Sequence, residues 1–357
     1  MSAVGARTRS VWLEAGAVAA VALPLLLLMD AYVRDQPTPR NDELIYDRMA
    51  SDPFDPHTFP FAYRIAVPLL VHISPLDRTP TFSLLAWLSC AAIAALAYVL
   101  MRRFHIGKLL SAGLAVCLAV SPVLFVVSIR QGHNVDAESV LVMFAGALAI
   151  VDRRPWVLAT IVLVGATVRE SALFLVPLAY AVWAEKPWDP RALRQTLVAA
   201  VPGLVAYATI RLAVPSVARE QVVGYGGSFL EGRRDVLETN AEAPVPVLRR
   251  LVLAFGPLWL VAPFALRDMP WARRGLVLVA ACLAGMLFAL DWGRIIFLAA
   301  PVVVVAAAWV LNTRPRLAVA VVGAFLVMNL GYMVYMEDLG GAQDGIIDTG
   351  PSAYPAI

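Results

Sequence analysis

The stretch WLEAGAVAAVALPLLLLMDAYV, residues 12–33, decides the class of this protein. It holds only two charged side chains, Glu14 and Asp30, and is otherwise apolar or small. A helix that crosses the hydrocarbon core of a membrane needs about 20 such residues. Arg7 and Arg9 precede the run, and no clear small-x-small cleavage site follows it. This arrangement predicts a signal-anchor helix that is retained.

The composition extends this prediction to the whole chain. Of its 357 residues, 60% are hydrophobic and 15% are charged, whereas a soluble domain carries about 25% charged residues. We therefore expect an all-α, polytopic transmembrane helix bundle, with residues 1–357 as a single integral membrane domain. There is no basic run of the kind that binds nucleic acid. Three cysteines, Cys90, Cys117 and Cys282, lie in apolar stretches without a CxxC motif, so no disulfide is expected.

About eleven apolar segments could cross the membrane, and the shorter ones, between 137 and 184, make the count uncertain by one or two. Their ranges are 12–33, 81–101, 109–128, 137–151, 155–168, 171–184, 192–214, 250–266, 275–290, 295–311 and 317–335.

The short loops between these segments predict an orientation. Cytoplasmic loops carry an excess of Lys and Arg. With the N-terminus in the cytoplasm, every short inner loop is basic and every short outer loop has one arginine with at least one acid. The inner loops are RRFHIGK (102–108), DRRP (152–155), EKPWDPRALR (185–194), RDMPWARR (267–274) and NTRPR (312–316), and the outer loops are IRQGHNVDAE (129–138), VRE (168–170) and DWGR (291–294).

This orientation predicts a multi-pass protein of the plasma membrane, with an extracytoplasmic tail at 336–357. Two long extracytoplasmic segments are expected at 34–80 and 215–249. In the first, NDELIYDRMA (41–50) and FAYRIAVPLLVHI (61–73) predict two short amphipathic helices at the membrane interface, separated by a proline-rich turn.

Polar clusters of different segments all fall on this outer face. Asp42 and Glu43 follow the first segment, and a carboxylate at the edge of a bundle can act as a general base. The alternative is a solvated acid pair that favours a helix N-terminus.

A second cluster contains His133, Asn134, Asp136 and Glu138. The two acids are two positions apart, so we expect one to face the bundle and the other to face water. Acids at a helix N-terminus are the structural alternative, and a metal site at His133 is a weaker one. We expect no metal and no cofactor.

Arg169 with Glu170, and Asp291 with Arg294, form two further clusters. Ionisable residues near membrane depth usually face a cavity or a partner. The planar fork of arginine suits phosphate or carboxylate. The alternative is that these residues belong to tight outer turns. With the other clusters, the mixture of acids and arginines favours a lipid-linked anionic substrate.

The motif NDELIYDRMA resembles an element of the C-type (GT-C) membrane glycosyltransferases, which use polyprenyl-phosphate sugars as donors. Members often carry an acid, a tyrosine and a small residue just after the first span. The resemblance places the catalytic acid of the family on Asp42, with Glu43 as its neighbour, and the tyrosine of the motif on Tyr46.

Other outer-face elements extend the resemblance. PFAYRIAVPLL (60–70), with Tyr63 and Arg64, is similar to a Tyr-Arg…Pro element of bacterial members. NVDAE (134–138) and VRESALFLVPL (168–178) resemble later elements of the family. The second half of the chain is similar mainly in its hydrophobic layout and in DWGR.

The resemblance implies inverting transfer of a sugar from a polyprenyl-phosphate donor to a bacterial cell-envelope glycan, glycolipid or protein. Asp42 would deprotonate the acceptor hydroxyl, Glu43, Asp136 or Glu138 would orient it, and Arg64, Arg169 and Arg294 are the candidates for holding the phosphate. Membrane lipids are the other expected partners. Two alternatives stay open: a transporter or flippase of a lipid-linked or anionic solute, and a non-catalytic scaffold for envelope synthesis.

Overall fold

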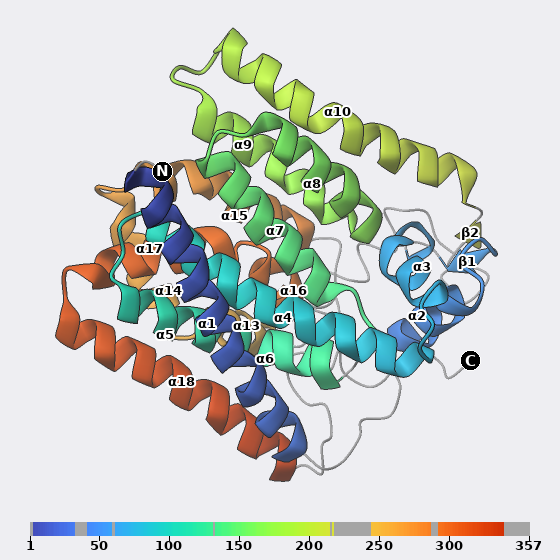
Figure 1. Cartoon of the computed structure of the whole chain (residues 1–357), viewed down its shortest axis with the longest axis horizontal. Helices are drawn as coiled ribbons and strands as arrows, with labels where there is room; N and C mark the ends of the chain where they lie inside the picture. Colours follow the sequence, from blue (N-terminus) through green and yellow to red (C-terminus); the bar gives the residue numbers. More distant parts are fainter. Residues whose placement is uncertain are drawn as a thin grey trace.

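The chain folds into an assembly of packed helices (Figure 1). This computed structural model describes residues 3–32, 41–58, 61–130, 133–214, 216–217, 244–286 and 292–338. Among these residues the one sheet is a parallel pairing of two short strands, β1 (His57–Thr58) and β2 (Ser216–Val217). All other described elements are helices, so the all-α prediction is confirmed.

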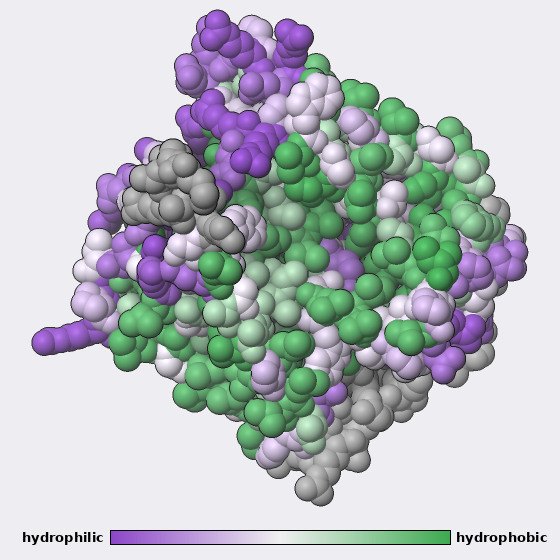
Figure 2. Space-filling view, viewed as in Figure 1, coloured by the Kyte–Doolittle hydropathy of each residue, from purple (hydrophilic) through white to green (hydrophobic). Residues whose placement is uncertain are grey.

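Four helices are long and apolar enough to cross a membrane, and by length and composition they identify a membrane protein. They are α1 (Ala3–Tyr32), α4 (Arg78–Arg103), α10 (Pro190–Ala213) and α18 (Pro315–Asp338). In Figure 1, α10 and α18 lie along opposite edges of the bundle. Figure 2 shows a broad hydrophobic surface across one face, with hydrophilic residues gathered toward its margins.

The other predicted segments are also helical, but they form shorter pieces, so the count of about eleven crossings stays a prediction. These pieces are α5 (Lys108–Ala119), α6 (Pro122–Leu124), the π-helix η2 (Phe125–Arg130), α7 (Asp136–Val151), α8 (Pro155–Val168), η3 (Glu170–Phe174), α9 (Leu175–Trp183), α13 (Pro244–Phe255), α14 (Leu258–Val261), η4 (Ala262–Leu266), α15 (Pro270–Met286), α16 (Trp292–Phe297) and α17 (Ala300–Asn312).

Three segments predicted as continuous helices are interrupted near a proline. The interruptions precede Pro122, Pro257 and Pro301. Proline has no N–H to donate and clashes with the preceding turn, so it favours the start of a helix, although Pro24 and Pro202 lie inside α1 and α10. The affected predictions are the segments 109–128, 250–266 and 295–311.

Gly256 ends α13 in a left-handed conformation, with φ of +48°. A Cβ atom there would also lie 2.7 Å from the side chain of Met328 in α18. Glycine is the residue that adopts this conformation without steric cost. This turn lets α14 approach the core closely.

The core of the bundle is centred on α17. Its residues Ala300–Ala308 are all buried, and the helix packs against α4, α5, α7 and α15. By contrast, α10 exposes large apolar side chains such as Leu197, Leu204 and Val205. An apolar surface that no protein covers is the expected surface of a helix in lipid. The three cysteines are buried and free.

Helix α18 is joined to α5 by a buried hydrogen bond. The side-chain amide of Asn329 donates from Nδ2 to the carbonyl of Cys117, at 2.7 Å. The N–H of Ser121 bonds instead to the Leu118 carbonyl. Asn329 therefore serves one of the carbonyls near the end of α5 that a helix terminus leaves without an intrahelical partner.

The basic loops meet at one end of the bundle. Three contacts join four of them: Arg103 with Asp152, the ring of Phe104 with that of Trp271, and the backbone N–H of Gly107 with the side chain of Asn312. A further bond runs from Arg274 to the carbonyl of Val182, just before the fifth loop. The grouping of these loops agrees with the sequence analysis.

The opposite end carries the first long predicted loop, on the right in Figure 1. Its two predicted helices are present as α2 (Asn41–Ser51) and, after the 3-10 turn η1 (Phe61–Tyr63), α3 (Ala66–His72). Pairing of β1 with β2 places residue 216 beside this loop. The second long segment ends before α13 begins at Pro244, not at 249, and residues 218–243 and 339–357 lie outside the described residues.

Candidate functional site

A buried carboxylate joins three elements at the α2 end of the bundle. Asp136, the first residue of α7, accepts a hydrogen bond from Arg169 on Oδ1. Its Oδ2 accepts from Nη1 of Arg294 in α16, at 3.1 Å. Arg169 directly follows α8. One carboxylate therefore holds two guanidinium groups that are 125 positions apart in sequence.

A third arginine is fixed beside this pair. Arg64 donates from Nη2 and Nε to the two carboxylate oxygens of Glu170, at 2.7 and 3.2 Å. Its Nη1 donates to the hydroxyl of Tyr46, at 3.2 Å. Burial opposes the charge of Arg64, but Glu170 and Tyr46 outweigh this effect and raise its pKa well above the ordinary value.

These five charged residues, Arg64, Arg169, Arg294, Asp136 and Glu170, form one unit that we call the arginine cluster. Glu170 follows Arg169 in the chain, and the charge of Arg64 acts on Asp136. The cluster thus combines three guanidinium groups with two carboxylates. The side chains of Arg64 and Arg169 are only 10% and 8% exposed, so water screens these charges weakly.

Asn134 and Glu138 lie two positions on either side of Asp136 in the chain, and the charge of Asp136 acts on Glu138. Glu138 accepts a hydrogen bond on Oε1 from Ser89 in α4, at 3.1 Å. Its Oε2 and the Nδ2 of Asn134 are buried, without a hydrogen-bond partner among the described residues. We expected either Asp136 or Glu138 to face water, and this prediction is wrong. Because α4 packs against α7, both carboxylates turn inward.

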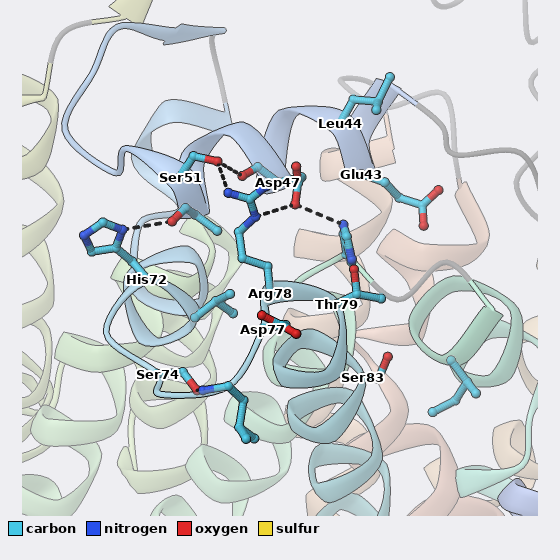
Figure 3. Close-up of a pocket in the computed structure, with 15 residues that line it drawn as sticks. Glu43, Leu44, Asp47, Ser51, His72, Ser74, Asp77, Arg78, Thr79 and Ser83 are labelled. Atoms are coloured by element: carbon cyan, nitrogen blue, oxygen red, sulfur yellow. Dashed lines mark hydrogen bonds and ion pairs between the residues drawn. The ribbon is translucent and has the colours of Figure 1, made fainter.

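A cavity of about 980 Å³ is lined in part by His133, three positions before Asp136, and by Asp47, next to Tyr46, which bonds to Arg64. We call it the α2 cavity, since α2 forms one wall and the α3–α4 connection forms another (Figure 3). Its ionisable lining residues are Glu43, Asp47, His72, Asp77, Arg78 and His133, and its hydroxyl-bearing ones are Ser51, Ser74, Thr79 and Ser83.

A polar network lies on the wall of the α2 cavity. Arg78 donates from Nε to Asp47, at 3.1 Å, and from Nη1 to the hydroxyl of Ser51. Nδ1 of His133 lies 3.8 Å from Oδ1 of Asp47. The ring of His133 stacks on Phe82, with centroids 4.7 Å apart.

The setting of His133 disfavours its protonated form. Burial lowers its pKa most strongly, Asp47 opposes that effect, and Arg78 adds to it. The described lining of the cavity thus contains the carboxylates of Glu43, Asp47 and Asp77 and the guanidinium of Arg78.

The structure brings together most of the residues predicted from the sequence. Arg64, Asp136, Arg169, Glu170 and Arg294 form the cluster, with Tyr46 bonded to it. Glu43 and His133 line the adjacent cavity.

Three predicted site residues fall elsewhere or cannot be placed. Tyr63 lies outside the cluster, because its ring stacks on Arg211 from α10, with 4.5 Å between them. Asp42 belongs to the first turn of α2, but its side chain lies outside the described part, and Asp291 is not among the described residues. The described residues hold no group of three His, Cys, Asp or Glu that could bind a metal ion.

The sequence analysis did not single out Asp47, Asp77 and Arg78. Asp47 could have been found, because it lies four positions after Glu43 on a predicted helix and so on the same face. No comparable signal links Arg78 to Asp47, which is 31 positions away.

A scan against protein-family models finds no match to this chain, and a search of curated proteins finds none either. The likeness to GT-C enzymes therefore rests on the short outer-face motifs, and a function has to be argued from the geometry of the arginine cluster and the α2 cavity.

Proposed function

We propose that this chain is an inverting glycosyltransferase of the GT-C type, which transfers a sugar from a polyprenyl-phosphate donor to a cell-envelope acceptor. The α2 end would face the extracytoplasmic side of the plasma membrane, and the basic end would face the cytoplasm. The observation that carries this proposal is the placement of a cationic cluster next to an open acidic cavity, at one end of an apolar bundle.

The arginine cluster suits the phosphate of the donor. It gathers three guanidinium groups, and each presents several N–H groups in a plane that matches phosphate oxygens. Negative charge develops on the phosphate as the sugar leaves, and buried, prearranged cations stabilise such charge better than water does. A monophosphate that arginines neutralise requires no metal ion.

The acidic residues of α2 suit the other half of the reaction. Asp42 would accept the proton of the acceptor hydroxyl, and Glu43, which lines the cavity, would orient that hydroxyl. The acceptor oxygen would then form a bond to the anomeric carbon. The bond from that carbon to the phosphate oxygen would break on the opposite face, and its electron pair would leave with polyprenyl phosphate.

Asp136 is a poor choice for the general base. Both of its oxygens are already bonded to guanidinium groups, and an ion-paired carboxylate holds a proton weakly. We assign it instead as a positioning residue, which holds Arg169 and Arg294 at a common point.

A transfer assay tests this function. The chain, purified into lipid nanodiscs, is given decaprenyl- and undecaprenyl-phosphate carrying glucose, mannose or arabinose, with a membrane extract as acceptor. We expect sugar transfer and release of polyprenyl phosphate. Asp42→Asn should lower the rate by about 100-fold or more, because general base catalysis contributes about 10²–10⁴-fold.

Asp55→Asn is the matched control, since Asp55 is an exposed acid of the same loop that does not line the cavity. It should leave the rate unchanged. Full activity in both Asp42→Asn and Glu43→Gln would overturn the catalytic assignment. Flux of the intact donor across proteoliposomes, without transfer from any donor, would favour the transporter or flippase, and the absence of both activities would favour the scaffold.

A further inference from the structure

We infer that the basic end of the helix pair α8 and α10 binds an anionic phospholipid, with its phosphate held by arginines and its acyl chains on the apolar side of the pair. This lipid site is separate from the site of the proposed function. It requires only that the chain lies in a membrane, as its long apolar helices indicate.

The two helices begin at the same end of the bundle and run side by side (Figure 1). They approach closely at Gly203, where a Cβ atom would lie 2.5 Å from the side chain of Val162. Arg154 precedes Val162 by eight positions and Arg194 precedes Gly203 by nine. At about 1.5 Å per residue, these separations correspond to about 12 and about 14 Å along the helices. The two arginines therefore lie at the same level of the pair.

Four arginines at this level have no side-chain partner within the described part of the chain. Each is exposed, and none forms a side-chain hydrogen bond, ion pair or ring contact there. They are Arg153 and Arg154 before α8, and Arg191 and Arg194 in the first turns of α10. Their planar N–H groups match phosphate oxygens, so together they suit an anionic headgroup.

The acids of the same two loops do not neutralise these arginines. Asp152 is paired with Arg103, at 3.1 Å. Asp189 accepts hydrogen bonds from backbone N–H groups in the first turn of α10, and the charge of Lys186 acts on it. The remaining acid, Glu185, is exposed beside Lys186. This end of the pair is therefore positive, and its charge is complementary to that of an anionic lipid.

An exposed apolar surface begins beside the arginines. Trp156 and Trp188 are 72% and 86% exposed, and tryptophan is enriched at the level of lipid headgroups. On α10, Leu197 and Val201 are exposed and follow Arg194 by three and seven positions, so these three residues share one side of the helix. A phospholipid joins a phosphate to acyl chains in the same order, whereas a free phosphate would use only the arginines.

A lipid titration tests the inference. The full chain in detergent is titrated with phosphatidylglycerol, cardiolipin and phosphatidylethanolamine of matched acyl chains, and bound lipid is counted by native mass spectrometry. In phosphatidylethanolamine the ammonium group neutralises the phosphate. We expect the two anionic lipids to bind about tenfold more tightly or better, because each basic residue near an anionic headgroup contributes about fivefold in affinity.

A pair of double variants locates the site. Arg154→Gln combined with Arg194→Gln should weaken the binding of both anionic lipids about tenfold or more. Arg314→Gln combined with Arg316→Gln is the matched control, since it removes the same charge from exposed positions of another basic loop. The control should leave the affinity unchanged. All four positions are exposed, so both variants should keep the unfolding midpoint of the native chain.

Three results would overturn the inference: equal binding of all three lipids, preference for phosphatidylethanolamine, or an equal loss in the two double variants. An excess of inorganic phosphate tests the source of the bound phosphate. It should not displace the anionic lipid, because it cannot occupy the apolar side of α10. Displacement would indicate a site for free phosphate and would also overturn the inference. No arm measures sugar transfer, so the outcome is independent of the proposed function.

Discussion

The arginine cluster and the α2 cavity lie at the same end of the bundle, yet they handle charge in opposite ways. In the cluster, the side chains of Asp136 and Arg169 are 6% and 8% exposed and bonded to each other. In the cavity, those of Asp47 and Arg78 are 32% and 48% exposed. Buried charges depend on their partners in the protein, whereas exposed charges can exchange partners with water or a ligand.

This difference separates a rigid part of the site from an adaptable one. A buried ion pair that loses one member leaves a charge that the surrounding protein cannot solvate. A lining residue that is lost from the cavity is replaced by water. Mutations in the two regions should therefore have effects of different size and kind, and the four predictions below are arranged from the largest effect to the smallest.

The largest effect is expected for Asp136→Ala. Removal of one partner from a buried ion pair costs about 3–5 kcal/mol, because the remaining charge is left uncompensated, and here two arginines would be left without their shared carboxylate. Thermal unfolding in detergent, followed by circular dichroism, would show a clearly lower midpoint. Asp47→Ala in the cavity is the comparison, and an equal loss in both variants would contradict the distinction.

A smaller loss is expected for Arg64→Lys. Lysine keeps the charge but cannot form the two-pronged contact with Glu170 and also bond to Tyr46. Since hydrogen bonds to charged groups are worth about 1.5–3 kcal/mol each, we expect a loss of about that size, measured as above. Arg48→Lys, at an exposed position on α2, is the control. Equal losses of stability in Arg64→Lys and Arg48→Lys would mean that the two-pronged contact of Arg64 does not contribute to stability.

The pH dependence of stability should report on His133. Its pKa is lowered in the folded protein by burial, so the unfolded chain binds more protons as pH falls through the ordinary histidine value of about 6.5. Stability attributable to His133 is thus present above that pH and is lost below it. The unfolding midpoint of the native protein should decrease as the pH is lowered from 7.5 to 5.5. The midpoint of His133→Gln should decrease less. Identical pH profiles would remove His133 as a cause.

The smallest effect is expected for the pair of Asp47 and Arg78. A double-mutant cycle with Asp47→Asn and Arg78→Gln should give a coupling of about 0.2–1 kcal/mol, as exposed ion pairs do. Raising the salt concentration should lower it further. A coupling above about 2 kcal/mol would place this pair with the buried ones and remove the contrast between the two regions.

Much of the fold could be predicted from the sequence, because apolar length and basic loops are local signals. Each of the eleven segments contains helix among its described residues, and the five basic loops gather at one end. Proline is a signal for a helix break, so the sequence could have predicted the interruptions at Pro122, Pro257 and Pro301. Hydropathy alone does not show them, because the residues around each proline are apolar. The number of crossings depends on a membrane position that hydropathy and helix length do not determine.

The site could be predicted only as a set of candidates. Periodicity places residues on a helix face, but it does not tell which faces meet. The bonds from Asp136 to Arg169 and Arg294 join positions 33 and 158 apart. Tyr63, next to Arg64 in the chain, points instead to Arg211. Such pairings depend on how the helices pack in three dimensions. The spacing of charges along the chain does not predict that packing.

The bond between Asn329 and Cys117 has a consequence for how the protein is made. The two residues are 212 positions apart, and at about 5–20 residues per second a ribosome needs about 10–40 s to cover that distance. During that interval α5 is already synthesised while α18 does not yet exist. The hydrogen bond to the Cys117 carbonyl can form only after α18 has been synthesised, so α5 reaches its final packing against α18 only then.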